Sequence, residues 1–131
     1  MDTNVLVSAA LTVHGTCGQI IDLLVQGAFG ACADDRVLDE YDTVLRRPEF
    51  RIVSEDAEVV LELLRSVAEP VAGIPLAAVL PDPKDTPFLE VAAASGAVLV
   101  AGNRRHFPKN ACKGVPLASP SEFLEILRHS H

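Results

Sequence analysis

The carboxylate of Glu40 falls on the apolar face of the helix that the sequence predicts around it. Glu40 follows Val37 by three residues and precedes Val44 by four, and residues at these spacings share one face of a helix. A carboxylate on the core side of a helix is costly unless it is paired or bound to a metal ion. Glu40 is therefore a candidate metal ligand. The alternatives are a solvated edge of the apolar stripe or an ion pair with an arginine.

A second acid, Asp85, lies in the proline-rich segment Pro81–Pro87. The prolines favour a turn that brings Asp85 to the beginning of a helix starting near Thr86, where Pro occupies the first helical position. Helix capping or simple turn chemistry is the alternative for Asp85. Asp82, flanked by two prolines, is more typical of a turn residue.

Two further polar residues lie at the ends of predicted elements. Asn103 follows the continuous apolar run Ala97–Ala101, and Asp2 precedes the apolar run Val5–Leu11. Ligand sites in open parallel sheets lie at the carboxyl ends of the strands, which makes Asn103 a candidate. A turn residue is the alternative for Asn103, and a helix cap is the alternative for Asp2.

The elements that must position these residues alternate between helical patterns and short apolar runs. Helices are predicted over Gln19–Val25, from Asp34 or Asp35 to about Leu45, over Ser54–Val67, from Thr86 to Gly96, and after the capping box Ser119–Glu122. In the third of these, Ser54 is the predicted cap and Val59 belongs to the predicted apolar face. Buried strands are predicted at Ala28–Ala33, Ala97–Ala101 and Val115–Ala118. Val71–Leu80 is expected to be a loop. This alternation predicts an α/β fold with a parallel sheet covered by helices on both faces.

Composition limits the class of protein. The chain has 131 residues, 49% of them apolar, which fits one globular domain spanning 1–131. No apolar run reaches the roughly 20 residues of a membrane span, and no signal peptide precedes the first element. The cysteines at 17, 32 and 112 form no metal-binding or disulfide pattern. We therefore expect a cytoplasmic protein that does not enter a membrane.

The net charge of −7 counts against a nucleic-acid-binding protein. The objection weakens if several acids gather around a cation, because the bound ion reverses the local sign of the charge. Most other acids fall on solvent faces of helices, and Glu90 is interpreted as one of them. The bases form two clusters, one at Arg46, Arg47 and Arg51 and one at Arg104, Arg105, Lys109 and Lys113.

Four segments, in this order along the chain, resemble the motifs of PIN domains. They are Asp2–Ala9; Leu38–Tyr41 with Val44–Phe50; Asp82–Asp85 with Phe88, Leu89 and Ala92; and Val98–Asn103 with His106, Phe107 and Pro108. The resemblance covers nearly the whole chain. The second of these segments looks specifically like the branch of the family that is assigned as toxins of toxin–antitoxin pairs.

The resemblance implies a Rossmann-like three-layer α/β/α sandwich with a mostly parallel central sheet. It also implies a metal-dependent endoribonuclease. By position, Asp2, Glu40 and Asp85 would bind Mg²⁺ or Mn²⁺, Asn103 would complete the catalytic set, and Asn4 would support the site. Candidate contacts to the phosphates of RNA are Arg46, Arg47, Arg104, Arg105 and Lys109. His106 is interpreted as part of a structural turn.

Three features depart from the family pattern. Asn103 lacks the negative charge common at its position, and Ala101 replaces a hydroxyl residue. The chain also begins one residue before Asp2, where the family has a short apolar strand in the middle of its sheet. Either the start codon is misassigned or this chain lacks that strand.

Three functions follow as hypotheses. The first is a ribonuclease toxin, expected to bind a cognate antitoxin protein and to form a homodimer. The second is a catalytically degenerate PIN domain that binds RNA or protein without cutting. The third, a phospho-acceptor domain, needs an acidic pair after an early strand and a lysine after a late strand, where this sequence has Asn103.

Overall fold

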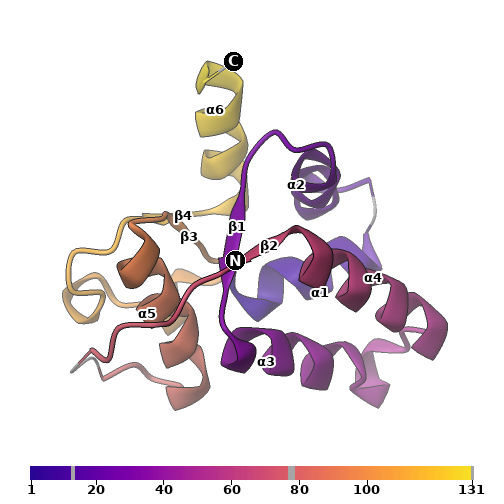
Figure 1. Ribbon diagram of the computed structural model, residues 1–131, viewed down its shortest axis with the longest axis horizontal. Coiled ribbons are helices and arrows are strands. Elements are labelled where there is room, and N and C mark those ends of the chain that lie inside the picture. Colours follow the sequence, from indigo (N-terminus) through magenta and orange to yellow (C-terminus); the bar gives the residue numbers. More distant parts are fainter. Residues whose placement is uncertain (13, 77–78, 131) are drawn as a thin grey trace.

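A computed structural model of the chain describes residues 1–12, 14–76 and 79–130 (Figure 1). The α-helices are α1 Thr3–Leu11, α2 Thr16–Val25, α3 Asp35–Leu45, α4 Ser54–Val67, α5 Thr86–Ser95 and α6 Pro120–Ser130. Short 3₁₀ turns are η1 Pro48–Phe50, η2 Pro83–Asp85, η3 Arg104–His106 and η4 Lys109–Ala111. The strands are β1 Ala31–Ala33, β2 Ala68–Pro70, β3 Leu99–Val100 and β4 Leu117–Ala118.

The helix ends follow the local chemistry that the sequence predicted. Asp34 caps α3 by accepting a hydrogen bond from the Val37 N–H at 3.0 Å. Gly96 ends α5 in the left-handed conformation, with φ of 69°, which a residue without Cβ adopts at little cost. The capping box before α6 is confirmed by reciprocal bonds between Ser119 and Glu122. Ser54 and Thr86, predicted as caps, are instead the first residues of their helices.

The strands are shorter than predicted, and in the described residues they form two separate pairs. β1 pairs with β2 and β3 pairs with β4, both in parallel. The α/β class is therefore confirmed, but a single central sheet within a three-layer sandwich is not seen. β2 was not predicted at all, because it lies in the short gap between the predicted helix Ser54–Val67 and the predicted loop Val71–Leu80. Pro70 is the last residue of this edge strand.

The helices lie on both sides of β1. In Figure 1, α5, β3 and β4 lie on one side of β1, and α1, α3 and α4 lie on the other. The N-terminus lies near the middle of the molecule, and the Asp2 N–H donates to the Val100 carbonyl at 2.9 Å. The first residues of the chain therefore run between the two strand pairs.

The predicted apolar face of α4 is confirmed except at Val59, since Leu64 is buried and Val60 and Val67 are half-buried against the core. Ala57, Leu61 and Leu64 are buried, whereas Val59 is 65% exposed. The buried residues recur at i, i+4 and i+7, which is one helical stripe. Val59 lies away from that stripe, so its apolar character misled the sequence interpretation.

The interpretation of Glu90 as a surface acid is wrong. Glu90 is buried, and its Oε1 accepts a hydrogen bond from Arg36 at 2.7 Å. Its Oε2 accepts from the Leu76 N–H at 2.8 Å. As predicted for this loop, the backbone of 71–76 has no helix or strand. The Glu90 carboxylate connects it to α5 and to Arg36 of α3, and the Ile74 N–H also donates to the Glu90 carbonyl at 3.3 Å. Residues 77 and 78 of the predicted loop lie outside the described residues.

Glu90→Ala is expected to lower the free energy of unfolding by about 2–3 kcal/mol, because it leaves a half-buried N–H and an arginine without their acceptor. Arg36 is half-exposed, so water replaces part of the lost ion pair. Urea unfolding measures the change. The matched control is Glu125→Ala, which removes an exposed ion pair to Arg128 and should change stability by less than about 0.5 kcal/mol. Equal losses in the two variants would contradict the assignment.

No single helix among the described residues has the length and apolar composition needed to cross a membrane. Within the part of the chain that the structure describes, one pair of helices, α1 and α2, would be long and apolar enough if counted together, but the pair is sharply bent.

Candidate acidic site

Asp2 joins the beginning of α1 to the end of β3. The residue is 1% exposed. Its Oδ1 accepts from the Val5 N–H and its Oδ2 accepts from the Gly102 N–H, each at 3.1 Å. The predicted helix cap accounts for the hydrogen bond from Val5. The second hydrogen bond, from Gly102, was not predicted. Burial raises the pKa of the Asp2 carboxyl, and the two backbone hydrogen bonds act in the opposite direction.

The two hydrogen bonds that Asp2 accepts, from the Val5 and Gly102 N–H groups, form a clamp between α1 and the end of β3. This clamp depends on close packing at Gly102. A Cβ built on Gly102 would lie 2.9 Å from the Cβ of Asn4, and that atom is fixed to the first turn of α1. Any side chain at position 102 must therefore move α1 or the turn after β3. Either movement would lengthen the hydrogen bond from the Gly102 N–H to Asp2.

Gly102→Ala is expected to destabilise the fold by about 1–3 kcal/mol, as overpacking of a tight contact does. The melting temperature measured by circular dichroism checks this. Gly30→Ala is the control, because a Cβ there would meet only the flexible Glu69 carboxylate at 3.7 Å. If the Gly102→Ala protein were as stable as the Gly30→Ala protein, Asn4 and α1 would move away from the added Cβ at no cost in stability.

Asp85 lies at the junction of η2 and α5 with its carboxylate largely buried. The side chain is 13% exposed, and its Oδ2 lies 3.3 Å from the Nδ1 of His106. Among the described residues, that oxygen has no hydrogen-bond partner of acceptable geometry. The side chain makes no capping bond to α5. The capping alternative for Asp85 therefore does not account for its carboxylate.

The pKa of the Asp85 carboxyl is shifted by burial and by the charged groups around it. Burial raises the pKa of Asp85 to about 6. His106 acts in the opposite direction, while the negative charges of Asp82, Asp2 and Glu40 raise the pKa further. The fold thus brings Asp2, which caps α1, and Glu40, on α3, into electrostatic range of Asp85 in η2.

Glu40 is half-buried on α3. Among the described residues it forms no ion pair, so the arginine-paired alternative finds no support there. The acids are nevertheless not in contact: in the described part of the chain, no three His, Cys, Asp or Glu side chains are close enough together to hold one metal ion.

Asn103 does not join the three acids. It is exposed, and its Oδ1 accepts from the Arg105 N–H at 3.0 Å, which starts the turn η3. This is the turn-residue alternative that the sequence left open. Asn4 is likewise exposed, on the first turn of α1 beside Gly102.

His106 is the residue that sequence interpretation undervalued. Its contact with Asp85 and its effect on the pKa of Asp2 place an imidazole beside two of the three acids. The available signal was its position three residues after Asn103, just past the carboxyl end of the buried run that contains β3. The structural turn is real, since His106 ends η3, and the turn directs the ring to Asp85.

The candidate phosphate contacts divide into two groups. Arg46 pairs with Asp42 and Glu58, and Arg104 pairs with Glu122. Within the described residues, the side chains of Arg47, Arg105 and Lys109 form no ion pair, and Arg105 and Lys109 are exposed. Arg105 and Lys109 lie within three residues of His106 in the sequence.

The fold and the site define an α/β domain in which acids from two other parts of the chain, Asp2 and Glu40, act electrostatically on Asp85. The model of the PIN domain family matches residues 1–105, and the chain belongs to the PIN domain family. Membership indicates a nuclease-type hydrolase in general, and PIN domains typically use divalent metal ions. Searches of curated proteins and of solved structures found no match.

Proposed function

We propose that this PIN domain is a metal-dependent endoribonuclease that hydrolyses the phosphodiester bonds of RNA. The observation that carries the proposal is Asp85, whose buried Oδ2 lacks a hydrogen-bond partner among the described residues and lies within the field of two further acids. Perturbed carboxylates of this kind are concentrated at functional sites, because burial and like charges cost stability elsewhere.

The donor set suits Mg²⁺ or Mn²⁺ in its chemistry, since both ions prefer oxygen ligands. A cation would relieve the repulsion among the three acids. Because no three side chains of the described residues are close enough to bind one ion directly, Asp85 would hold the ion and Asp2 and Glu40 would contact it through water, as Mg²⁺ keeps several waters. When bound, such an ion neutralises charge on a phosphate and acidifies a water molecule.

The residues of the chain then have separate tasks. Asp2 is fixed by two backbone N–H groups, so its position is set before substrate binds. The His106 Nδ1, 3.3 Å from the Asp85 Oδ2, would orient that carboxylate. Arg105 and Lys109 would contact phosphates, which sets affinity and salt dependence rather than base choice. Asn103 would act through the turn that carries His106.

Cleavage of single-stranded and hairpin RNA by the purified protein tests the proposal. Cleavage should require Mn²⁺ or Mg²⁺ and should stop with EDTA. Glu40→Gln should reduce it, and the matched variant Asp39→Asn, on the exposed face of the same helix, should leave it intact. If Glu40→Gln cleaves like the unchanged protein, the acidic site is not the catalytic centre.

A second function has its own observation. The three acids do not converge to metal-binding distance in the described residues, and Asn103 is taken up by its turn. A degenerate PIN domain that binds RNA or protein without cutting would have such a site. RNA binding in a gel-shift assay, without metal-dependent stabilisation or cleavage, would favour it.

We further propose the biological setting that the family branch implies. The ribonuclease would be the toxin of a cytoplasmic toxin–antitoxin pair, held inactive by a cognate antitoxin protein, and would act as a homodimer. Growth arrest on expression, relieved by coexpression of the neighbouring gene, would support this role. Unimpeded growth with an active purified nuclease would separate the toxin role from the enzyme.

A further inference from the structure

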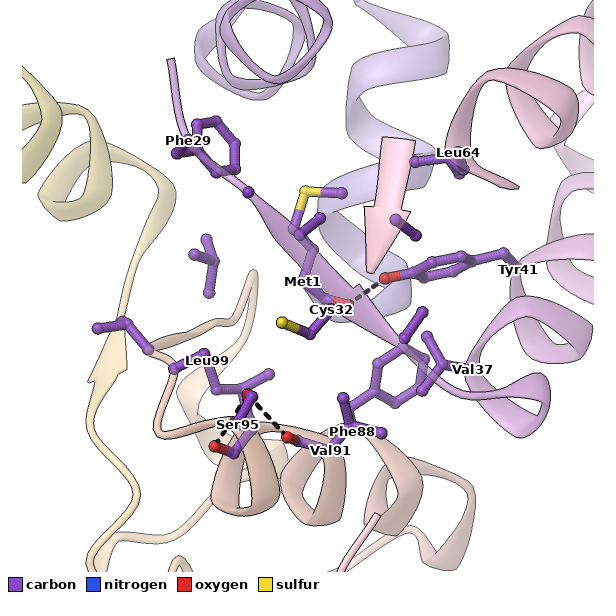
Figure 2. A pocket seen from close by; sticks show the side chains of 18 of the residues that line it. Met1, Phe29, Cys32, Val37, Tyr41, Leu64, Phe88, Val91, Ser95 and Leu99 are labelled. Atoms are coloured by element: carbon purple, nitrogen blue, oxygen red, sulfur yellow. Dashed lines mark hydrogen bonds between the residues drawn. The ribbon is translucent and has the colours of Figure 1, made fainter. Parts of the chain in front are cut away.

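Tyr41 carries a buried hydroxyl for which the packing of the core alone gives no reason. The residue lies on the buried face of α3, directly after Glu40, and is 4% exposed. Its side chain lines an apolar cavity of about 170 Å³ together with Met1 and Phe88 (Figure 2). A phenol hydroxyl among apolar side chains is costly unless it forms a hydrogen bond. Phenylalanine would fill the same space, so the hydroxyl itself requires an explanation.

The Tyr41 hydroxyl donates to the backbone carbonyl of Met1 at 2.6 Å, and a dashed line marks this bond in Figure 2. The same peptide unit forms a second hydrogen bond, because the Asp2 N–H donates to the Val100 carbonyl of β3 at 2.9 Å. A peptide unit is planar, so bonds to its C=O and N–H groups together fix its orientation. The Cα of Asp2 lies in this plane. Tyr41 therefore takes part in setting the position of Asp2.

The cavity increases the importance of this hydrogen bond. Met1 lines the cavity, and protein interiors contain few voids larger than a water molecule. A cavity of about 170 Å³ leaves room for the peptide between Met1 and Asp2 to move. Packing alone therefore does not hold that peptide, and the Tyr41 hydroxyl supplies a constraint from α3. Burial raises the pKa of this hydroxyl and the charge of Asp2 raises it further, so the group remains a hydrogen-bond donor.

The ring of Tyr41 connects α3 to α5. It packs against the ring of Phe88, with the ring centroids 5.6 Å apart, and Phe88 lies three residues after Asp85 in the first turn of α5. This contact holds the beginning of α5 against α3. Tyr41 therefore contacts or belongs to the elements that carry all three acids. It follows Glu40 on α3, bonds the peptide before Asp2, and packs against the helix that begins after Asp85.

We propose that Tyr41 is a positioning residue for the acidic site. Its hydroxyl holds the peptide before Asp2, so that Asp2 and Glu40 keep a fixed spacing around a cation bound by Asp85. This inference rests on the proposed metal-dependent function. The attraction between a carboxylate and a cation falls as their separation increases. A displaced Asp2 would therefore weaken binding of the cation even though no acid has been removed.

The Mn²⁺ affinity of the Tyr41→Phe protein tests the proposal. The variant keeps the ring and its contact with Phe88 and loses only the hydroxyl. Calorimetric titration with Mn²⁺, well below the melting temperature of each protein, should give a dissociation constant raised by about tenfold, as loss of a group that orients a metal ligand does. A residue that only supports the fold would lower stability without changing the affinity of the folded protein. Equal Mn²⁺ affinities of Tyr41→Phe and the unchanged protein would overturn the proposal.

Ser95→Ala is the matched control for the titration. It removes a hydroxyl that lines the same cavity, but this hydroxyl donates to the carbonyls of Val91 and Ala92 within its own helix. The Ser95→Ala protein should bind Mn²⁺ with unchanged affinity. An equal loss of affinity in Ser95→Ala and Tyr41→Phe would trace the effect to the cavity in general and would overturn the positioning role.

Amide hydrogen exchange in EDTA gives a second measurement that needs no metal. The Gly102 N–H donates to the Asp2 carboxylate at 3.1 Å, whereas the neighbouring Ala101 N–H donates to the Ala118 carbonyl of β4 at 3.0 Å. In Tyr41→Phe the Gly102 N–H should exchange at least about tenfold faster while the Ala101 N–H keeps its rate, because only the first depends on Asp2. Unchanged exchange at Gly102, or equal acceleration at both positions, would overturn the proposal.

The two measurements separate failure of this inference from failure of the proposed function. If the unchanged protein binds no Mn²⁺, the proposed function fails, and exchange at Gly102 still supports or overturns the positioning of Asp2 by Tyr41. If the unchanged protein binds Mn²⁺ and Tyr41→Phe binds it equally well, the proposed function stands and the positioning role fails.

Discussion

Asp85→Asn is expected to reduce RNA cleavage by at least about 100-fold, because it removes the carboxylate that we propose holds the metal ion. The same change should make the metal-free protein more stable. Burial and the nearby charges of Asp2 and Glu40 oppose ionisation of Asp85, and an amide of the same shape carries no charge. The expected gain is about 1–2 kcal/mol at pH 7.5, from a pKa displaced by about two units and partly offset by the lost contact with His106.

Urea unfolding in EDTA measures the stability, and cleavage of a labelled RNA with Mn²⁺ measures the activity. Asp82→Asn is the matched control, since Asp82 is an exposed acid on the same turn and an amide can still accept from the Lys84 N–H. It should leave cleavage and stability close to those of the unchanged protein. A less stable Asp85→Asn protein would mean that the carboxylate serves the fold, and unchanged cleavage would remove Asp85 from the proposed centre.

The pH dependence of stability in EDTA should carry the mark of Asp85. Its pKa is about 6 in the folded protein against an ordinary value of 3.8. Between these values the folded chain holds a proton that the unfolded chain has lost, so the contribution of Asp85 to stability falls as the pH rises from about 4 to 6. Asp2, whose pKa is also raised, acts in the same direction. Asp85→Asn should flatten the curve of unfolding free energy in this window, and an unchanged slope would contradict the assigned burial.

The helices of this fold could be predicted more closely than its sheets. Helix ends depend on local chemistry, such as the Asp34 cap and the left-handed Gly96, which a single sequence displays. The strands depend on partners distant in the chain. Ala68–Pro70 was recognised as a strand only through its pairing with Ala31–Ala33, because a proline after a helix resembles a simple stop.

The site shows the same division. The resemblance selected Asp2, Glu40 and Asp85 as site residues, and this stays a prediction. The charges of Asp2 and Glu40 do act on Asp85. The contact between His106 and Asp85 could not, since it depends on how the turn after β3 faces α5. The interpretation of Glu90 as a surface acid was wrong for a similar reason, because its partner Arg36 lies 54 residues away in the chain. Spacing along a helix indicates which face a residue occupies but not which element covers that face.

Asp2→Ala should be the most destabilising change in the acidic site. It leaves the Val5 and Gly102 N–H groups without their acceptor in a region that is almost completely buried. Loss of a helix cap costs about 1 kcal/mol and an unsatisfied buried donor costs about 1–3 kcal/mol. We therefore expect a loss of about 2–4 kcal/mol, measured by urea unfolding in EDTA.

Asp2→Asn separates the two contacts of this carboxylate. Its amide oxygen can still accept from the Val5 N–H and cap α1, but its NH₂ group faces the Gly102 N–H, where two donors oppose each other. The Asn variant should therefore be more stable than the Ala variant and still less stable than the unchanged protein. Asp2→Ala within about 0.5 kcal/mol of the unchanged protein would mean that the clamp between α1 and β3 does not hold Asp2. The position of the acid would then depend on its backbone, whose N–H donates to the Val100 carbonyl at 2.9 Å.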